Sequence, residues 1–260
     1  MATKFFDKPF DEGTILKLQI YQAYAEVWIP PFLMSGHKEI FIYDFFAGAG
    51  YDENHVQGSP IQILKKIENF NELIIKQNST INVIFNDKDQ NYIKELQSNV
   101  ETFIISNSQL KNLRVNKLLE IEYFNTDFEK LFQELTNEIK DKPSLVYIDQ
   151  MGIKFFKEKY ILDFGKMKQT DFLYFISSSF LKRFSDVKEF DFLQPEDVEI
   201  YKKSPNNYIH SIFLERIKAR LPEHSDLKLY PFTIKKGANV YGIVFGSTHL
   251  LAVDKFLKIC

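Results

Sequence analysis

Short apolar runs and longer segments of helical periodicity alternate along most of the chain. The runs with the length and composition of buried strands cover residues 40–45, 81–85, 121–124, 145–148 and 172–176. The segments with apolar residues at helical spacing cover residues 60–69, 89–100 and 128–139. Strands and helices that alternate in this rhythm predict a parallel sheet with right-handed crossovers, which is a Rossmann-like, doubly wound α/β fold.

The two ends of the chain differ from this pattern. Apolar residues repeat at helical spacing over residues 14–34, and the pair Pro30-Pro31 is expected to interrupt that helix. We therefore predict a helical N-terminal extension over residues 1–38. Residues 227–234 and 240–245 are strand-like and are separated by the turn-like sequence KKGAN, which predicts a C-terminal antiparallel hairpin.

One further segment, about residues 180–225, is irregular and charged. We predict that it forms a helical insertion that covers the ligand-binding edge of the sheet, because ligands bind at the carboxyl ends of parallel strands. No linker or internal repeat interrupts the chain, so we predict a single domain over residues 1–260.

Composition narrows the class of protein. The chain is 45% hydrophobic, which is enough for the core of an α/β domain, and its net charge of −2 argues against a whole-chain electrostatic grip on nucleic acid. A single cysteine, Cys260, excludes an internal disulfide, and the five scattered histidines show no metal-site spacing. The chain has no signal-peptide pattern and no apolar run of bilayer length. We expect a soluble, cytoplasmic protein without a metal and without membrane contact.

The stretch YDFFAGAGYDENHVQGSP joins the first strand to the next helix. Gly48 and Gly50 lack a Cβ atom, so their backbone can pass close to a ligand, and Asp44 at the strand end can accept hydrogen bonds from an amine. The dinucleotide pattern G-x-G-x-x-G needs a helix directly after the glycines, whereas residues 51–57 intervene here. A nucleoside site is therefore favoured over a pyrophosphate site, and a nicotinamide dehydrogenase is the weaker interpretation.

Acidic residues follow the next two strands. Asp87, or Asp89 two residues later, is placed to bind the two hydroxyls of a ribose, and Asp87 is preferred because it lies nearer the strand end. We include Lys88 between them in the candidate set. Asp127 can hold an adenine amino group while Phe128 covers the ring. Asp127 is equally well placed to cap the helix that starts at Phe128, and both roles fit one residue only if its two oxygens divide the work.

Two other positions complete the candidate site. The sequence Gly58-Ser59-Pro60 predicts a helix start with Ser59 as the N-cap, and the free N–H groups there can face a cofactor carboxylate. The fourth strand is followed by Asp149, at the place where substrate chemistry is expected. Lys17, in the first helix, is a further candidate for a carboxylate contact.

Glycines or acids at four successive strand ends form an arrangement that resembles S-adenosylmethionine-dependent methyltransferases. The first loop of that family is matched by Asp44, Phe46, Ala47, Gly48 and Gly50. The resemblance implies S-adenosylmethionine as cofactor and the class I methyltransferase type of sheet. It assigns the ribose to Asp87, the adenine to Asp127 and Phe128, and the fourth-strand motif to Asp149.

A closer resemblance extends over about residues 14–255. The segments IYDFFAGAG…GSPIQIL, FNDKD, VYIDQMGIKFF, FISSSFLKRF and YGIVFGSTHL, in this order, are similar to the three-Cys-motif partner protein (TcmP) family. The opening helix, ILKLQIYQAYAEVWI, also resembles that of the family. This resemblance implies a methyltransferase-like protein that works with a cysteine-motif protein partner.

The fourth-strand motif departs from the pattern of the family. The family carries Asp-Pro-aromatic-Gly, whereas this chain has Asp149-Gln150-Met151-Gly152. Two hypotheses follow. The first is a methyltransferase in which Asp149 positions or deprotonates the acceptor, with nucleic acid as the candidate substrate. The second is a binding subunit that keeps the fold and serves a partner protein. The sequence leaves the oligomeric state open.

Overall fold

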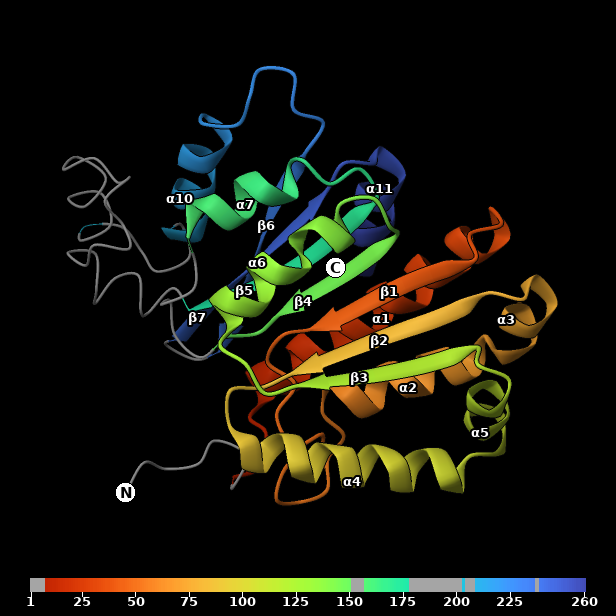
Figure 1. Ribbon diagram of the computed structural model, residues 1–260. Helices are drawn as coiled ribbons and strands as arrows, with labels where there is room; N and C mark the ends of the chain where they lie inside the picture. Colours follow the sequence, from red (N-terminus) through yellow and green to blue (C-terminus); the bar gives the residue numbers. More distant parts are fainter. Residues whose placement is uncertain (1–7, 151–156, 178–202, 204–208, 237–238) are drawn as a thin grey trace.

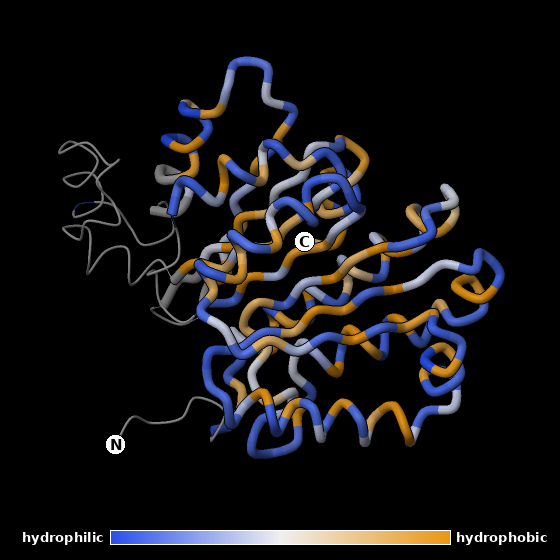
Figure 2. Tube along the Cα trace, in the orientation of Figure 1, coloured by the Kyte–Doolittle hydropathy of each residue, from blue (hydrophilic) through white to orange (hydrophobic). Residues whose placement is uncertain are grey.

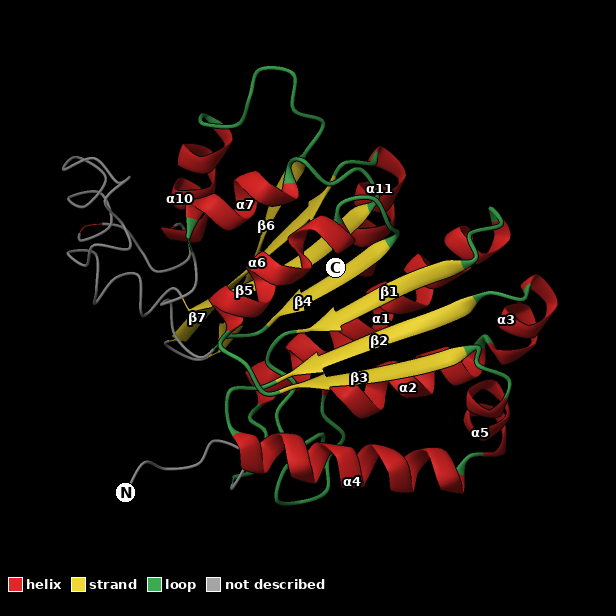
Figure 3. Ribbon diagram, in the orientation of Figure 1, coloured by secondary structure: helices red, strands yellow, loops and turns green. Residues whose placement is uncertain are grey.

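The computed structural model describes residues 8–150, 157–177, 203, 209–236 and 239–260. A seven-stranded sheet with the order β3-β2-β1-β4-β5-β7-β6 forms the centre of the molecule, and helices cover both of its faces (Figures 1 and 3). The strands are β1 (Glu39–Asp44), β2 (Thr80–Asn86), β3 (Leu119–Phe124), β4 (Ser144–Ile148), β5 (Thr170–Ser177), β6 (Lys228–Lys236) and β7 (Asn239–Ser247). The described helices are α1 (Glu12–Met34), α2 (Ser59–Asn69), α3 (Asn71–Gln77), α4 (Gln90–Ser106), α5 (Ser108–Val115), α6 (Phe128–Ile139), α7 (Glu158–Phe164), α10 (Ile209–Lys218) and α11 (Leu250–Ile259).

The direction of the strands confirms the predicted fold class. Strands β1 to β5 are parallel, and β7 pairs antiparallel with both β5 and β6. This is the mostly parallel, doubly wound sheet of the class I methyltransferase type, with its C-terminal antiparallel hairpin. Strand β1 lies between β2 and β4, so the chain order reverses there, and the crevice at the carboxyl ends of these strands is the expected ligand site.

The side chains of the strands point alternately to the two faces of the sheet and form a separate hydrophobic core on each face. In β1, Ile40 and Ile42 join the cluster beneath α1, α2, α4 and α11, whereas Phe41 and Tyr43 join the cluster beneath α6, α7 and α10. Because side chains of a strand point alternately to its two faces, a strand buried on both sides must be apolar throughout. Figure 2 shows this as long hydrophobic stretches along the central strands.

The prolines of α1 do not interrupt the helix, which is a correction to our prediction. Helix α1 continues through Pro30 and Pro31 to Met34. Proline at position 31 has no N–H to donate to the carbonyl of Val27. The ammonium of Lys255, from α11, donates to that carbonyl at 2.9 Å instead, so the last turn can form although a helix bond is missing.

Short helices were the main omission from the sequence prediction. Helices α3, α5, α7 and α11 span seven to ten residues each and bury only one to three residues each, so they complete too few turns for a clear periodicity signal. Of the predicted insertion at about 180–225, residues 178–202 and 204–208 lie outside the described residues, and α10 lies within it. No helix in the described ranges is long and apolar enough to span a bilayer.

Candidate functional site

The loop after β1 has a backbone that glycine alone adopts readily. Gly48 has φ of +60° and Gly50 has φ of +87°, both in the left-handed region. A Cβ atom at Gly50 would lie 2.9 Å from Leu96 Cδ1 of α4. The loop then turns back, and the N–H of Gly58 donates to the Gly50 carbonyl at 2.8 Å. The two glycines in the sequence therefore mark a tight turn at the switch point of the sheet.

Asparagine side chains that we did not predict hold this loop in place. Asn86, at the end of β2, donates from Nδ2 to the Phe45 carbonyl at 3.1 Å, and its own carbonyl accepts from the Ala47 N–H at 2.9 Å. Asn99 of α4 donates to the Ala49 carbonyl at 2.9 Å. These partners are distant in sequence, so no local pattern indicates them.

Asp44 is buried at the end of β1, next to this loop. It is 1% exposed, and its Oδ1 accepts from the Phe46 N–H at 3.2 Å. Within the described residues, Oδ2 is buried without a hydrogen bond of ordinary geometry. Burial raises the pKa of Asp44 to about 7, although the hydroxyl of Ser59 and the N–H of Phe46 favour the charged form. A buried carboxylate oxygen with unused hydrogen-bonding capacity is suited to a donor from a ligand.

Two tyrosines lie beside Asp44. Tyr147 of β4 is directly opposite Asp44 in the sheet register, and its ring stacks on that of Tyr21 from α1 with centroids 4.0 Å apart. Burial raises the pKa of both phenols, and the charge of Asp44 adds to this shift. The hydroxyl of Tyr21 is buried without a hydrogen-bond partner among the described residues. Helix α1 thus forms one wall of the site. The sequence offers Lys17 of this helix as a candidate but contains no signal for Tyr21.

Asp149, which follows β4, forms an ion pair with Lys17 of α1. Lys17 Nζ lies 2.5 Å from Asp149 Oδ1 and 2.6 Å from Oδ2, and it also lies 5.2 Å from the centre of the Phe175 ring. The two side chains are only 14% and 18% exposed. The structure therefore brings the predicted catalytic acid to the site, with a cation already bound to it. Met151 and Gly152 of the same motif lie outside the described residues.

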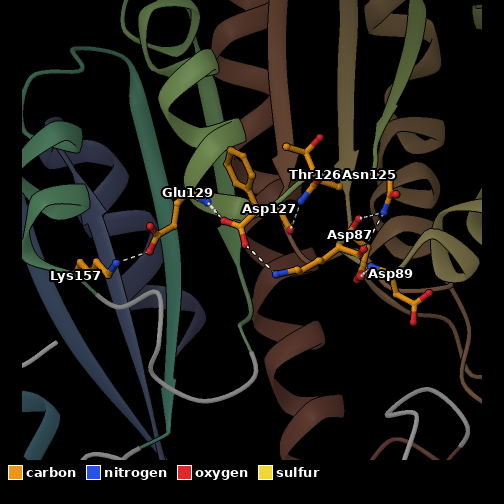
Figure 4. Close-up of polar contacts among 10 residues, drawn as sticks. Asp87, Asp89, Asn125, Thr126, Asp127, Glu129 and Lys157 are labelled. Atoms are coloured by element: carbon orange, nitrogen blue, oxygen red, sulfur yellow. Dashed lines mark hydrogen bonds and ion pairs between the residues drawn. The ribbon is translucent and has the colours of Figure 1, made fainter. Parts of the chain in front are cut away.

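Asp87 and Asp127 lie along the neighbouring strand ends, where Figure 4 shows them in a chain of polar contacts. Asp87 Oδ2 accepts from the Gly48 N–H at 3.1 Å, and Oδ1 accepts from the Asp89 N–H at 2.9 Å. Burial raises the pKa of Asp87. Each carboxylate oxygen can accept two hydrogen bonds, so Asp87 can still receive two hydroxyls. Asp89 caps α4 through the Asn91 N–H, which favours Asp87 for the ribose role.

Asp127 divides its two oxygens, as one of our interpretations required. Oδ1 caps α6 by accepting from the Glu129 N–H at 3.1 Å, and Oδ2 pairs with Lys88 Nζ at 3.2 Å. Lys88 is 72% exposed, so this ion pair adds little stability. The capping role is confirmed, whereas the adenine contact stays a prediction.

Phe128 does not present its ring to this edge. It is 2% exposed and packs edge-to-face on Phe45 and Tyr160, with ring centroids 5.2 Å apart in each pair. The structure therefore gives Phe128 a role in the core and leaves our prediction of a ring over adenine without support. Phe46, which is half-buried, lies next to it with ring centroids 5.4 Å apart.

Ser59 is also placed differently from our prediction. The N-cap of α2 is Gly58, and Ser59 is the first residue of the helix. Its hydroxyl interacts with Asp44 and is one of the groups that lower the pKa of that acid. The tight turn at Gly58 fixes this position, because its N–H is held by the Gly50 carbonyl. No group of three or more potential metal ligands occurs in the part of the chain that the structure describes.

The raised pKa of Asp44 predicts a pH-dependent cost to stability. Folding raises this pKa from 3.8 to about 7, so the folded protein keeps the proton that the unfolded chain loses. The contribution of Asp44 to stability is therefore greatest below pH 4 and falls between pH 4 and pH 7, by at most about 4 kcal/mol. We expect Asp44→Asn to remove this loss. Urea unfolding at pH 5 and pH 8 should show that the variant gains stability relative to the wild type at the higher pH.

A surface acid provides the control for this measurement. Asp254 is 55% exposed and pairs with Lys258. Asp254→Asn should change the free energy of unfolding equally at both pH values. An Asp44→Asn variant with the same pH dependence as the wild type would show that Asp44 is ionised in the folded protein throughout this range.

Solved structures with a similar fold are methyltransferases by description. They include a Klebsiella pneumoniae protein assigned as an O-methyltransferase, with 9% identity, a TM-score of 0.41 and coverage of 92% of this chain and 90% of that one. A human methyltransferase 10 domain containing protein has 9% identity and a TM-score of 0.42, over 93% of this chain and 85% of that one. A SAM-dependent methyltransferase from Aquifex aeolicus has 10% identity and a TM-score of 0.29, over 92% of this chain and 99% of that one.

Sequence comparisons add no closer relative. No protein-family model matches the chain, and no curated protein matches it. The strand order itself defines the class of fold. Identities near 10% and TM-scores below 0.5 leave the function to be argued from the residues of the site.

Proposed function

We propose that the protein is an S-adenosylmethionine-dependent methyltransferase. The observation that carries this proposal is the buried Oδ2 of Asp44, which makes no hydrogen bond of ordinary geometry among the described residues, beside two glycines with positive φ at the switch point of the sheet. A cofactor with an amine, a ribose and a nucleobase fits such a row of groups, because each part meets an acid at a successive strand end.

The residues present fit this cofactor in three places. Asp44 supplies an acceptor for the amino group, and the backbone from Phe46 to Gly50 allows the close approach that a side chain would prevent. Asp87 supplies acceptors for the two ribose hydroxyls. Asp127 lies one strand further along, after β3, where the base would be held, and Lys88 from the loop after β2 pairs with it. The start of α2, with Ser59, is proposed to face the carboxylate of the cofactor.

The chain itself has mainly to orient the reactants. The cofactor supplies an activated methyl group with a good leaving group, so alignment and exclusion of water are the main requirements. Asp149 is the residue proposed to position or deprotonate the acceptor. Lys17 holds this carboxylate in one orientation in the structure. The acceptor must then displace Lys17 or share the carboxylate with it.

The identity of the acceptor and of the partner rests on the family resemblance. The ordered segments shared with the three-Cys-motif partner proteins support a cysteine-motif protein partner. Class I enzymes with a related fourth-strand motif support nucleic acid as the acceptor, with the target base turned out of its stack. The activity proposed on this basis is the modification of nucleic acid. We place the protein in the cytoplasm because its sequence shows neither a signal-peptide pattern nor an apolar run of bilayer length.

A second function is favoured by the state of Asp149. Because Lys17 neutralises the only acid that we placed at the fourth strand end, the chain can also serve as a non-catalytic, partner-dependent subunit that keeps the cofactor fold. Both functions predict cofactor binding. They differ in whether the bound methyl group is transferred.

A methyl-transfer assay separates the two functions. The purified protein would be incubated with S-adenosylmethionine labelled in its methyl group and, in turn, with RNA, single-stranded DNA, duplex DNA and a protein extract. We expect label in one of the nucleic-acid fractions, in proportion to the amount of protein. Cofactor binding without label in any fraction would favour the binding subunit over the enzyme.

A further inference from the structure

A cavity lies at the opposite ends of the strands from the candidate cofactor site. Its volume is about 430 Å³, and helices α1 and α11 form its walls. The segments that line it include His37 before β1, Lys168 before β5 and His249 after β7. These positions mark the amino ends of the parallel strands, whereas Asp44 and Asp87 lie at the carboxyl ends. The cavity is therefore separate from the site described above.

Much of the cavity wall is apolar. Trp28 and Phe32 of α1 lie against each other with ring centroids 4.8 Å apart, and Pro31 lies between them in sequence. Leu251 and Ala252 line the side formed by α11. The volume falls within the range of about 300–1,000 Å³ that is typical of small-molecule sites, which are mostly apolar with a few convergent polar groups.

The polar groups at this cavity are mainly cations and hydrogen-bond donors. Neither Lys168 nor Lys255 forms an ion pair among the described residues, although Asp171 lines the same cavity and its charge acts on Lys255. Lys255 uses one of its three N–H groups on the Val27 carbonyl and keeps two. His249 accepts from the Leu251 N–H at Nδ1, so its neutral ring carries a proton at Nε2.

The one acid at the cavity is already engaged. Asp171 is 5% exposed and accepts from the Tyr24 hydroxyl at 2.7 Å. Burial raises its pKa to about 6, while Ser247, Tyr24 and the nearby His249 favour its charged form. Burial also lowers the pKa of Lys255, and Asp171 offsets part of this effect. Two ammonium groups face this cavity against one carboxylate, which already accepts from Tyr24, so a negative charge on a ligand would be favoured there.

We propose that this cavity binds a small organic anion with a flat apolar body, of the class of aromatic carboxylates and sulfonates. The rings of Trp28 and Phe32 provide the apolar wall for the body, and Lys168 and Lys255 provide the charge for the head group. This site is independent of the proposed transferase function, because it uses none of the residues at the carboxyl edge of the sheet.

The fluorescent probe 8-anilinonaphthalene-1-sulfonate has this chemistry and tests the proposal. We expect saturable binding of one probe per chain, measured by fluorescence and by calorimetry. Lys168→Met, alone and together with Lys255→Met, should weaken binding about tenfold or more, which is the effect of one charged hydrogen bond. Binding of the uncharged analogue N-phenyl-1-naphthylamine should change by less than about twofold, because it lacks the anionic group.

Two further variants locate the site. Ala252→Phe fills the cavity and should abolish the binding of both probes. Lys258→Met, on the outward side of α11, should leave both unchanged, since Lys258 is 74% exposed and pairs with Asp254. Thermal unfolding of each variant confirms that it is folded. The proposal is overturned if the sulfonate does not bind saturably, if the lysine variants bind it as the wild type does, or if folded Ala252→Phe retains it.

Discussion

Replacing Gly48 with valine is expected to abolish the binding of S-adenosylmethionine while the protein stays folded. Gly48 has φ of +60°, a conformation that a β-branched residue adopts only with strain of about 1–3 kcal/mol. The new side chain would also stand where the backbone must approach the ligand. We expect affinity to fall at least about 100-fold, measured by calorimetry, because a steric block and a shifted loop act together.

Gly36 provides a matched control for this substitution. It has φ of +83°, and a Cβ atom there would meet nothing within 4 Å. Gly36→Val therefore carries similar backbone strain, but at the amino end of β1, away from the site. It should lower the melting temperature by a similar amount and leave cofactor affinity unchanged. If Gly48→Val binds the cofactor as tightly as Gly36→Val does, the glycine loop is only a turn.

Replacing Asp149 with asparagine is the second change with a large expected effect. If Asp149 positions or deprotonates the acceptor, methyl transfer should slow by about 10²–10⁴-fold, the usual contribution of a general base. Cofactor affinity should stay within about threefold, because Asp149 is assigned to the acceptor rather than to the cofactor. The measurements are kcat in the methyl-transfer assay and the cofactor Kd by calorimetry.

The loss of this acid also has a structural cost that must be separated from catalysis. Asp149→Asn leaves the partly buried ammonium of Lys17 without its ion-pair partner, at a cost of about 1–3 kcal/mol. The control is Asp163 of α7, which forms an ion pair with Lys166 in the turn after that helix, with 2.7 Å between Oδ1 and Nζ. Lys166 is more exposed than Lys17, so losing its partner should cost less. Asp163→Asn should retain full transfer activity. Transfer at the wild-type rate in Asp149→Asn would remove this residue from the mechanism.

The strand ends could be predicted from sequence because their signals are local. Gly48 and Gly50 follow an apolar strand, and the structure shows both in a conformation that favours glycine. Asp87 is preferred over Asp89 from the sequence because it lies nearer the strand end, and the helix cap formed by Asp89 in the structure supports that choice. The order of apolar runs was sufficient for the fold class, because crossover handedness restricts the sheet to few arrangements.

The rest of the site depends on contacts between distant parts of the chain. The pair Lys17–Asp149 joins residues 132 positions apart, and a surface lysine and a site lysine look the same in sequence. Phe128 carries the same local signal whether it covers a base or packs on Phe45. The helix through Pro31 required a donor from Lys255, near the other end of the chain. Such outcomes follow from tertiary packing, which periodicity does not report.

The most direct test of the central claim is calorimetric titration of the wild-type protein with S-adenosylmethionine and, separately, with S-adenosylhomocysteine. The arrangement of Asp44, Gly48, Gly50 and Asp87 predicts one site per chain with a micromolar Kd for each compound. No heat of binding for either compound, from protein shown to be folded by its thermal transition, would contradict the assignment of this loop to the cofactor.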